Sequence, residues 1–201
     1  MSTARELIHQ GKNKEIWQKY CGFIDFSVDE FVEIQSHLLL EQLRLLEDCE
    51  LGHKLLWGLK PSSIEEFRQK VPLTTYEDYI PYLTDKREDV LPEKPMLWQR
   101  TSGTTGKHAE KWAPITKRLY DEVGYYATAM LAFSSAQRRG QFVIRDHDKL
   151  LYGMAPPPYA SGAMASLLDE EFPFEVMPPK AKADLMDFPE RIREGYSLAL
   201  T

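Results

Sequence analysis

The chain has 201 residues, of which 43% are hydrophobic and 28% charged, a composition typical of a soluble globular protein of one domain or part of a larger one. Its formal net charge of −6 gives no general field for attracting DNA, RNA or anionic lipid, so no nucleic-acid or membrane partner is expected. Cys21 and Cys49 form no disulfide framework, and no apolar run is long enough for a signal peptide or a membrane span, which predicts a cytoplasmic protein.

The first 94 residues are predicted to be mainly helical. Residues 27–30 have the spacing of a capping box, in which a hydroxyl and a carboxylate each satisfy the other's backbone amide. Apolar residues then recur at helical spacing, so one long helix is expected to end near Gly52. Two further boxes, at 62–65 and 74–77, predict two short helices.

From residue 95 onward, the pattern changes to strands that alternate with helices. Residues 96–100 are predicted to form a strand and 111–113 its partner, so the Gly/Thr-rich run between them becomes the tip of a hairpin. The elements expected after it are a long helix capped by Thr116, a buried strand at 150–155, a proline-rich loop at 156–162 that opens a helix, and a helix capped by Asp187.

This order predicts an α/β protein: a helical N-terminal region followed by part of a mixed β-sheet with flanking helices. The predicted division is 1–94 for the helical region and 95–201 for the first part of an α/β nucleotide-binding domain, the two forming one structural unit. No stop signal precedes Thr201, so the sheet is expected to continue in residues beyond it.

Residues 101–107, Thr-Ser-Gly-Thr-Thr-Gly-Lys, have the composition of a phosphate-binding loop. Glycines let backbone amides approach a ligand closely, successive amides form a nest for anions, and the hydroxyl and ammonium groups add donors and charge. The spacing is not that of P-loop NTPases, which have four residues between the glycines. The residues predicted to bind nucleotide phosphates are Thr101, Ser102, Gly103, Thr104, Thr105, Gly106, Lys107 and Lys111. The alternative is a hairpin tip that binds nothing.

A second candidate site is formed by Tyr159, Ser161 and Gly162, in the loop after the predicted strand at 150–155. The carboxyl ends of such strands are where α/β proteins bind ligands, so these residues are predicted to contact the substrate; the alternative is a stiff structural loop. The five histidines and two cysteines lack metal-ligand spacing, so no metal site is predicted among the side chains. Serine hydrolase, protein kinase and GTPase motifs are absent.

The 101–107 segment resembles the signature of the adenylate-forming superfamily, which contains acyl-CoA synthetases, luciferases and peptide-synthetase adenylation domains. Within it, the chain most resembles the auxin-responsive-type acyl-amido synthetases with their bacterial relatives, and phenylacetate–CoA ligase. Residues 71–79 resemble the segment that those branches carry ahead of the loop, and 112–116 resemble its strand-to-helix exit. The superfamily usually places Pro-Lys-Gly after the loop; this chain does not, and Lys111 is taken as the motif lysine.

The resemblance implies an ATP- and Mg²⁺-dependent carboxylate ligase. It would form an acyl-adenylate from a small carboxylic acid, release pyrophosphate, and pass the acyl group to an amine, such as an amino acid, or to the thiol of CoA. The loop would hold the β- and γ-phosphates, and Tyr159 would border the acyl pocket. Catalytic residues are expected in a missing C-terminal part of the same protein, so the chain alone is expected to be inactive. The alternative is a non-catalytic fragment acting as a helical binding or scaffold module with a vestigial phosphate loop.

Overall fold

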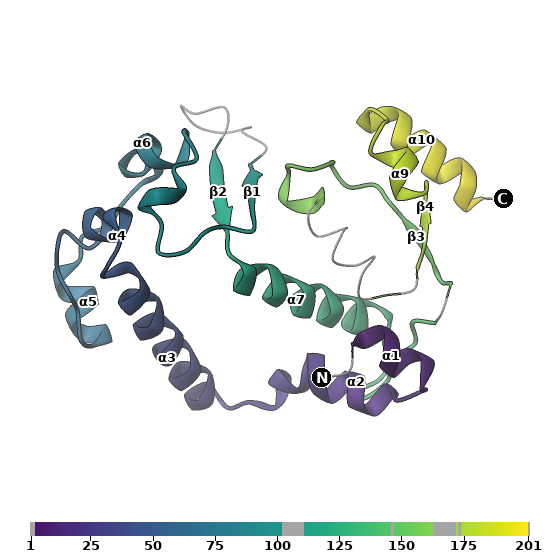
Figure 1. Cartoon of the computed structure of the whole chain (residues 1–201). Helices are drawn as coiled ribbons and strands as arrows, with labels where there is room; N and C mark the ends of the chain where they lie inside the picture. Colours follow the sequence, from purple (N-terminus) through teal and green to yellow (C-terminus); the bar gives the residue numbers. More distant parts are fainter. Residues whose placement is uncertain (1–2, 102–110, 146, 163–171, 173, 201) are drawn as a thin grey trace. The chain divides into compact units, whose positions relative to one another are not determined.

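The structure, a computed structural model, describes residues 3–101, 111–145, 147–162, 172 and 174–200 (Figure 1). The predicted α/β class is confirmed, with helices first and strands flanked by helices later. Contacts divide the chain into two compact units, Met1–Ile24 with Arg118–Thr201, and Asp25–Lys117. Because the first 24 residues pack with the C-terminal part, these limits differ from the predicted boundary after residue 94. The division of the natural protein into domains stays a prediction.

The unit of residues 25–117 consists of short helices followed by a hairpin. Its elements are α3 (Val28–Leu46), α4 (Glu50–Leu55), α5 (Ile64–Lys70), the 3₁₀ turn η2 (Tyr76–Asp78), α6 (Ile80–Leu83), the 3₁₀ turn η3 (Glu88–Val90), β1 (Leu97–Arg100) and β2 (Trp112–Ile115). The capping box at the start of α3 is confirmed, since the Glu30 N–H donates to Ser27 Oγ at 3.2 Å and the Ser27 N–H donates to the Glu30 carboxylate at 2.7 Å.

The prediction of one long helix ending near Gly52 is wrong, because the chain forms two helices there. α3 ends at Leu46, and Cys49 adopts an extended backbone and caps α4, its sulfur accepting a hydrogen bond from the Gly52 N–H at 3.2 Å. Gly52 lies so close to the end of α3 that an added Cβ would stand 1.7 Å from the Leu46 carbonyl oxygen. The apolar spacing continues through both helices, so periodicity alone does not reveal the break.

The cap of α5 lies one residue later than predicted. Ser63, rather than Ser62, accepts the hydrogen bond from the Glu66 N–H, at 3.1 Å. The Glu66 carboxylate accepts hydrogen bonds from Lys70 Nζ at 2.7 Å and from the Ser62 N–H at 2.8 Å. These hydrogen bonds, of which the one from Lys70 has the largest effect, lower the pKa of Glu66 from 4.5 to about 2.

We therefore expect the Glu66 carboxyl to titrate near pH 2. Because its folded pKa lies below the unfolded value of about 4.3, the stabilisation is fully present above that value and is lost as the pH falls through about 2. A ¹³C-detected NMR titration of the carboxyl measures this pKa. In Lys70→Gln it should move back towards 4.5; the same low pKa in that variant would show that Lys70 is not the main cause.

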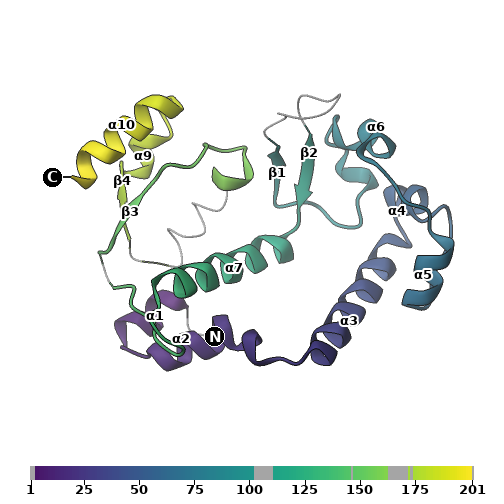
Figure 2. The same cartoon turned by 180° about the vertical axis from the view of Figure 1, so that it is seen from behind.

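β1 and β2 form the predicted antiparallel hairpin, with Leu97 opposite Ile115 and Arg100 opposite Trp112. A further hydrogen bond, from the Thr101 N–H to the carbonyl oxygen at residue 111 (2.9 Å), extends the pairing to the limit of the described residues. The predicted strand and partner are thereby confirmed, and α6 packs beside β2 in both views (Figures 1 and 2).

The other unit combines two N-terminal helices with the second half of the chain. Its elements are α1 (Ala4–His9), α2 (Asn13–Cys21), the 3₁₀ turn η1 (Gly22–Asp25) at its limit, α7 (Lys117–Ser135), β3 (Lys149–Leu151), β4 (Glu175–Met177), α9 (Lys180–Ala183) and α10 (Phe188–Ala199). Figures 1 and 2 both show α1 and α2 beside the C-terminal end of α7. Ile16 and Trp17 of α2 pack there with Ala129 and Ala132 of α7, and with Phe142, in one buried cluster.

β3 and β4 run parallel, and α10 packs against both (Figure 2). β3 ends at Leu151, so it is shorter than the predicted strand at 150–155, although the Tyr152 N–H still donates to the carbonyl oxygen of Met177 at 2.8 Å. α10 begins as predicted, since Asp187 Oδ1 accepts a hydrogen bond from the backbone N–H three residues on, at 2.7 Å. Gly195 of α10 faces the strands so closely that a Cβ would lie 2.8 Å from a side-chain carbon of Leu151.

Candidate functional site

Two of the eight residues predicted to bind nucleotide phosphates, Thr101 and Lys111, are described. They stand opposite each other at the loop end of the hairpin, joined by the 2.9 Å backbone hydrogen bond from the Thr101 N–H. Thr101 is exposed and Lys111 is half-buried. The other six lie outside the described residues: Ser102, Gly103, Thr104, Thr105, Gly106 and Lys107. The phosphate-binding role of all eight stays a prediction.

Aromatic side chains and lysines gather where the chain leaves the predicted loop. The Lys111 ammonium lies 5.3 Å from the centre of the Tyr76 ring, and the Lys86 ammonium lies 3.4 Å from the centre of the Trp112 ring. The Tyr76 hydroxyl accepts a hydrogen bond from the Trp112 N–H at 2.9 Å and donates to the Trp112 carbonyl at 3.4 Å. Cation–π contacts hold ammonium groups in place without neutralising them, so this end of the hairpin carries fixed positive charge.

The turn η2 places Tyr76 beside β2. Its cap is Thr75, whose N–H donates to Asp78 Oδ2 at 2.7 Å, so the box lies one residue later than the predicted 74–77 and opens a 3₁₀ turn rather than an α-helix. Tyr79 packs edge-to-face on Tyr76 and hydrogen-bonds Thr74 through its hydroxyl. Lys86 reaches Trp112 from a backbone in the left-handed region, at a φ of 52°. Sequence reasoning gave no role to Lys86.

The second candidate site forms a tight turn beyond the end of β3. The Ser161 hydroxyl donates to the Ala155 carbonyl at 3.4 Å, and the Gly162 N–H donates to the Tyr159 carbonyl at 3.0 Å. Gly162 is buried, and a Cβ there would lie 2.4 Å from the backbone nitrogen of Pro157, so no other residue fits without moving the loop. The structure thus brings Tyr159, Ser161 and Gly162 together in one turn, and their contact with a substrate stays a prediction.

Arg191 of α10 anchors the chain at the start of this loop. It is fully buried, and its guanidinium donates to the carbonyl oxygens of Met154 and Ala183, each at 2.7 Å. The guanidinium also lies 5.0 Å from the centre of the Tyr152 ring. Burial and, to a smaller extent, the charge of Asp184 raise the pKa of Tyr152, while the positive charge of Arg191 acts to lower it. An arginine on an amphipathic helix is normally exposed, so nothing in the sequence indicates that this one is buried.

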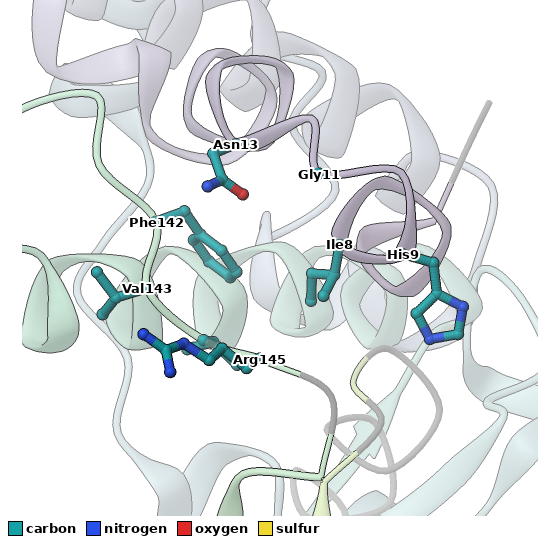
Figure 3. A pocket seen from close by; sticks show the side chains of 8 residues that line it. Ile8, His9, Gly11, Asn13, Phe142, Val143 and Arg145 are labelled. Atoms are coloured by element: carbon teal, nitrogen blue, oxygen red, sulfur yellow. The ribbon is translucent and has the colours of Figure 1, made fainter.

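A hollow of about 410 Å³ lies elsewhere in the same unit, between the turn that joins α1 to α2 and the extended segment after α7. Figure 3 shows Ile8 and Phe142 turned towards each other across it. Its lining is Ile8, His9, Gly11, Asn13, Phe142, Val143, Ile144 and Arg145. Of the predicted site residues that the structure describes, none is part of this lining.

Two further properties concern only the part of the chain that the structure describes. It contains no group of three or more His, Cys, Asp or Glu side chains arranged to hold a metal ion. It also contains no helix with the length and apolar character needed to cross a membrane.

Comparison with known proteins gives one family. The model of the GH3 family N-terminal domain matches residues 22–155, a stretch that includes α3, η2, the hairpin and α7. No curated protein and no solved structure matches the chain. The match covers more than half of the 201 residues. The chain therefore belongs to the GH3 family, the family of the auxin-responsive acyl-amido synthetases within the adenylate-forming superfamily.

Proposed function

We propose that this chain supplies the ATP-binding hairpin of an adenylate-forming ligase, in which residues 101–107 and Lys111 hold the β- and γ-phosphates. Family membership supports the class of reaction. The observation that carries the site is the cluster at the end of the hairpin, where the ammonium groups of Lys111 and Lys86 are held on the rings of Tyr76 and Trp112. A triphosphate requires fixed positive charge and many donors, and this end of the hairpin provides the charge.

In the proposed reaction, a substrate carboxylate attacks the α-phosphate of ATP, pyrophosphate leaves, and an acyl-adenylate remains. The hydroxyl and amide donors of 101–107 orient the β- and γ-phosphates, and Lys111 offsets the negative charge that develops on the departing pyrophosphate. Mg²⁺ bound to the phosphates shares that charge. Because Mg²⁺ keeps several waters and takes many of its ligands from substrate phosphates, it does not require a preformed cluster of protein ligands.

The acyl group then passes to an acceptor, for which an amine, such as that of an amino acid, is favoured over the thiol of CoA by the family. The turn with Tyr159, Ser161 and Gly162 is proposed to border the acyl pocket, because it follows the carboxyl end of β3. Cys21 and Cys49 are free thiols, which suits a reducing cytoplasm. The acceptor step and its catalytic residues are assigned to the C-terminal part of the protein, as the superfamily resemblance implies.

We expect calorimetric titration with Mg·ATP to show binding by the chain, and Lys107→Ala with Lys111→Ala to weaken it by about 100-fold or more. Each hydrogen bond between a charged donor and a phosphate contributes about 1.5–3 kcal/mol, and about 1.4 kcal/mol corresponds to a tenfold change. The matched control is Lys60→Ala with Lys94→Ala, which removes two lysines of exposed ion pairs in the same unit and should change the affinity little.

Equal affinity of the loop variant and the wild-type chain would reject the assignment of these lysines. A wild-type chain that does not bind ATP would instead favour the alternative, a helical binding or scaffold module whose hairpin does not bind a nucleotide.

A further inference from the structure

The register of the hairpin determines which backbone groups of β2 face away from β1. In an antiparallel pair, residues that exchange hydrogen bonds alternate with residues whose N–H and C=O groups point outward. The hydrogen bond from the Thr101 N–H to the carbonyl at 111 makes these two residues a hydrogen-bonded pair. The next pair along the strands, Arg100 and Trp112, is therefore one whose backbone groups point outward. The N–H and C=O of Trp112 therefore lie on the free edge of β2, immediately after Lys111.

A single hydroxyl satisfies both of these edge groups. The Tyr76 hydroxyl accepts from the Trp112 N–H at 2.9 Å and donates to the Trp112 carbonyl at 3.4 Å. The next outward position on the same edge is Pro114, which has no N–H to satisfy. No unpaired N–H therefore remains at Trp112 or Pro114 on this edge of β2. A shift of β2 along its own axis would break both hydrogen bonds between Trp112 and Tyr76.

The ring of Tyr76 also contacts the last residue before β2. The Lys111 ammonium lies 5.3 Å from the ring centre, while Lys86 is held 3.4 Å from the ring of Trp112. Tyr76 is in turn set by the cap of η2 at Thr75 and by its edge-to-face contact with Tyr79. One side chain therefore fixes both the backbone and the cation at the exit of the hairpin tip.

We infer that Tyr76 is a positioning residue for nucleotide binding: it holds β2 in register and holds Lys111 where the ammonium meets the β- and γ-phosphates of ATP. The inference rests on the proposed function, and it deepens it by naming the group that orders the site before ATP binds. A flexible lysine loses rotamer freedom when it binds a phosphate, so a lysine already held on a ring binds with a smaller entropy cost. Tyr76 itself does not contact the nucleotide.

The test is the ratio of ATP affinity to AMP affinity, measured by calorimetry in the presence of Mg²⁺. Tyr76→Phe keeps the ring and removes both hydrogen bonds to Trp112. We expect ATP affinity to fall about three- to tenfold, the effect of one or two neutral hydrogen bonds, with AMP affinity unchanged because AMP has no β- or γ-phosphate. The matched control is Tyr79→Phe, which removes a hydroxyl hydrogen bond from the same turn and should leave the ratio unchanged.

A double-mutant cycle with Lys111→Met separates positioning from a general loss of stability. If Tyr76 acts through Lys111, then Tyr76→Leu, which removes the ring as well as the hydroxyl, should lower ATP affinity in the wild-type background and have a clearly smaller effect in the Lys111→Met background. Additive effects, or a Tyr76→Phe variant that keeps the wild-type ratio of ATP to AMP affinity, would overturn the inference and leave the proposed function intact. A wild-type chain that does not bind ATP would overturn the proposed function itself.

Discussion

Gly52→Ala is expected to lower the free energy of unfolding by about 3 kcal/mol or more, because it forces α3 and α4 apart. The added methyl group would lie 1.7 Å from the Leu46 carbonyl oxygen and 2.5 Å from its carbon, distances that no rotamer can relieve because both atoms belong to the backbone. Moving α4 away would also stretch the hydrogen bond from the Cys49 N–H to the Leu46 carbonyl oxygen, now 3.5 Å. Urea-induced unfolding, followed by circular dichroism, measures the change.

The matched control is Gly58→Ala in the same unit. Gly58 has a positive φ of 71° and nothing within 4 Å of an added Cβ, so alanine meets only the strain of the left-handed backbone. That strain costs about 1–2 kcal/mol. Equal destabilisation by the two variants would mean that the close approach of α4 to α3 does not limit stability.

Arg191→Ala is expected to destabilise the chain by about 3–5 kcal/mol, since it empties a buried site and removes a charge-assisted hydrogen bond from each of two carbonyl groups. Among the residues that the structure describes, Arg191 is the largest fully buried side chain, and its hydrogen bonds to Met154 and Ala183 are both 2.7 Å long. The loss should be visible as a lower midpoint in thermal unfolding. We also expect faster amide exchange around residues 152–162, because the loop loses its anchor.

Arg193→Ala serves as the control on the same helix, because Arg193 is exposed. Its removal should change stability by no more than about 0.5 kcal/mol. Should Arg191→Ala unfold at the same temperature as Arg193→Ala, the buried guanidinium would not be the anchor of the loop.

Sequence reasoning was reliable where a structure depends on a few neighbouring residues. The capping box at Ser27, the helix cap at Asp187 and the pairing of 96–100 with 111–113 are local patterns, and each is present. The caps of the two short helices lie one residue later than predicted, because in each case two adjacent hydroxyl residues offer two possible caps. These pairs are Ser62 with Ser63 and Thr74 with Thr75.

What the sequence did not show depends on residues that meet only in the folded chain. The end of α3 is set by the approach of Gly52, and a glycine in an apolar repeat gives no sign of that contact. β4 (Glu175–Met177) has three residues, too few to show alternation, and is defined by its pairing with β3.

For the candidate site, too, the local features could be predicted from the sequence and the long-range contacts could not. The composition of 101–107 indicates phosphate binding, and the hairpin pairing predicts that its two ends meet, as Thr101 and the backbone at 111 do. The contacts of Lys86 with Trp112 and of Tyr76 with the edge of β2 cross 26 and 36 positions of the chain, and only the fold reveals them.

The most direct test of ATP binding by the hairpin is a crystal structure of the chain with Mg²⁺ and a non-hydrolysable ATP analogue. We expect β- and γ-phosphate oxygens at hydrogen-bond distance, about 2.7–3.2 Å, from the backbone amides of 101–107, with the Lys111 ammonium beside them. A nucleotide bound elsewhere, or a hairpin that stays empty at saturating analogue with its amides bonded within the protein, would contradict it.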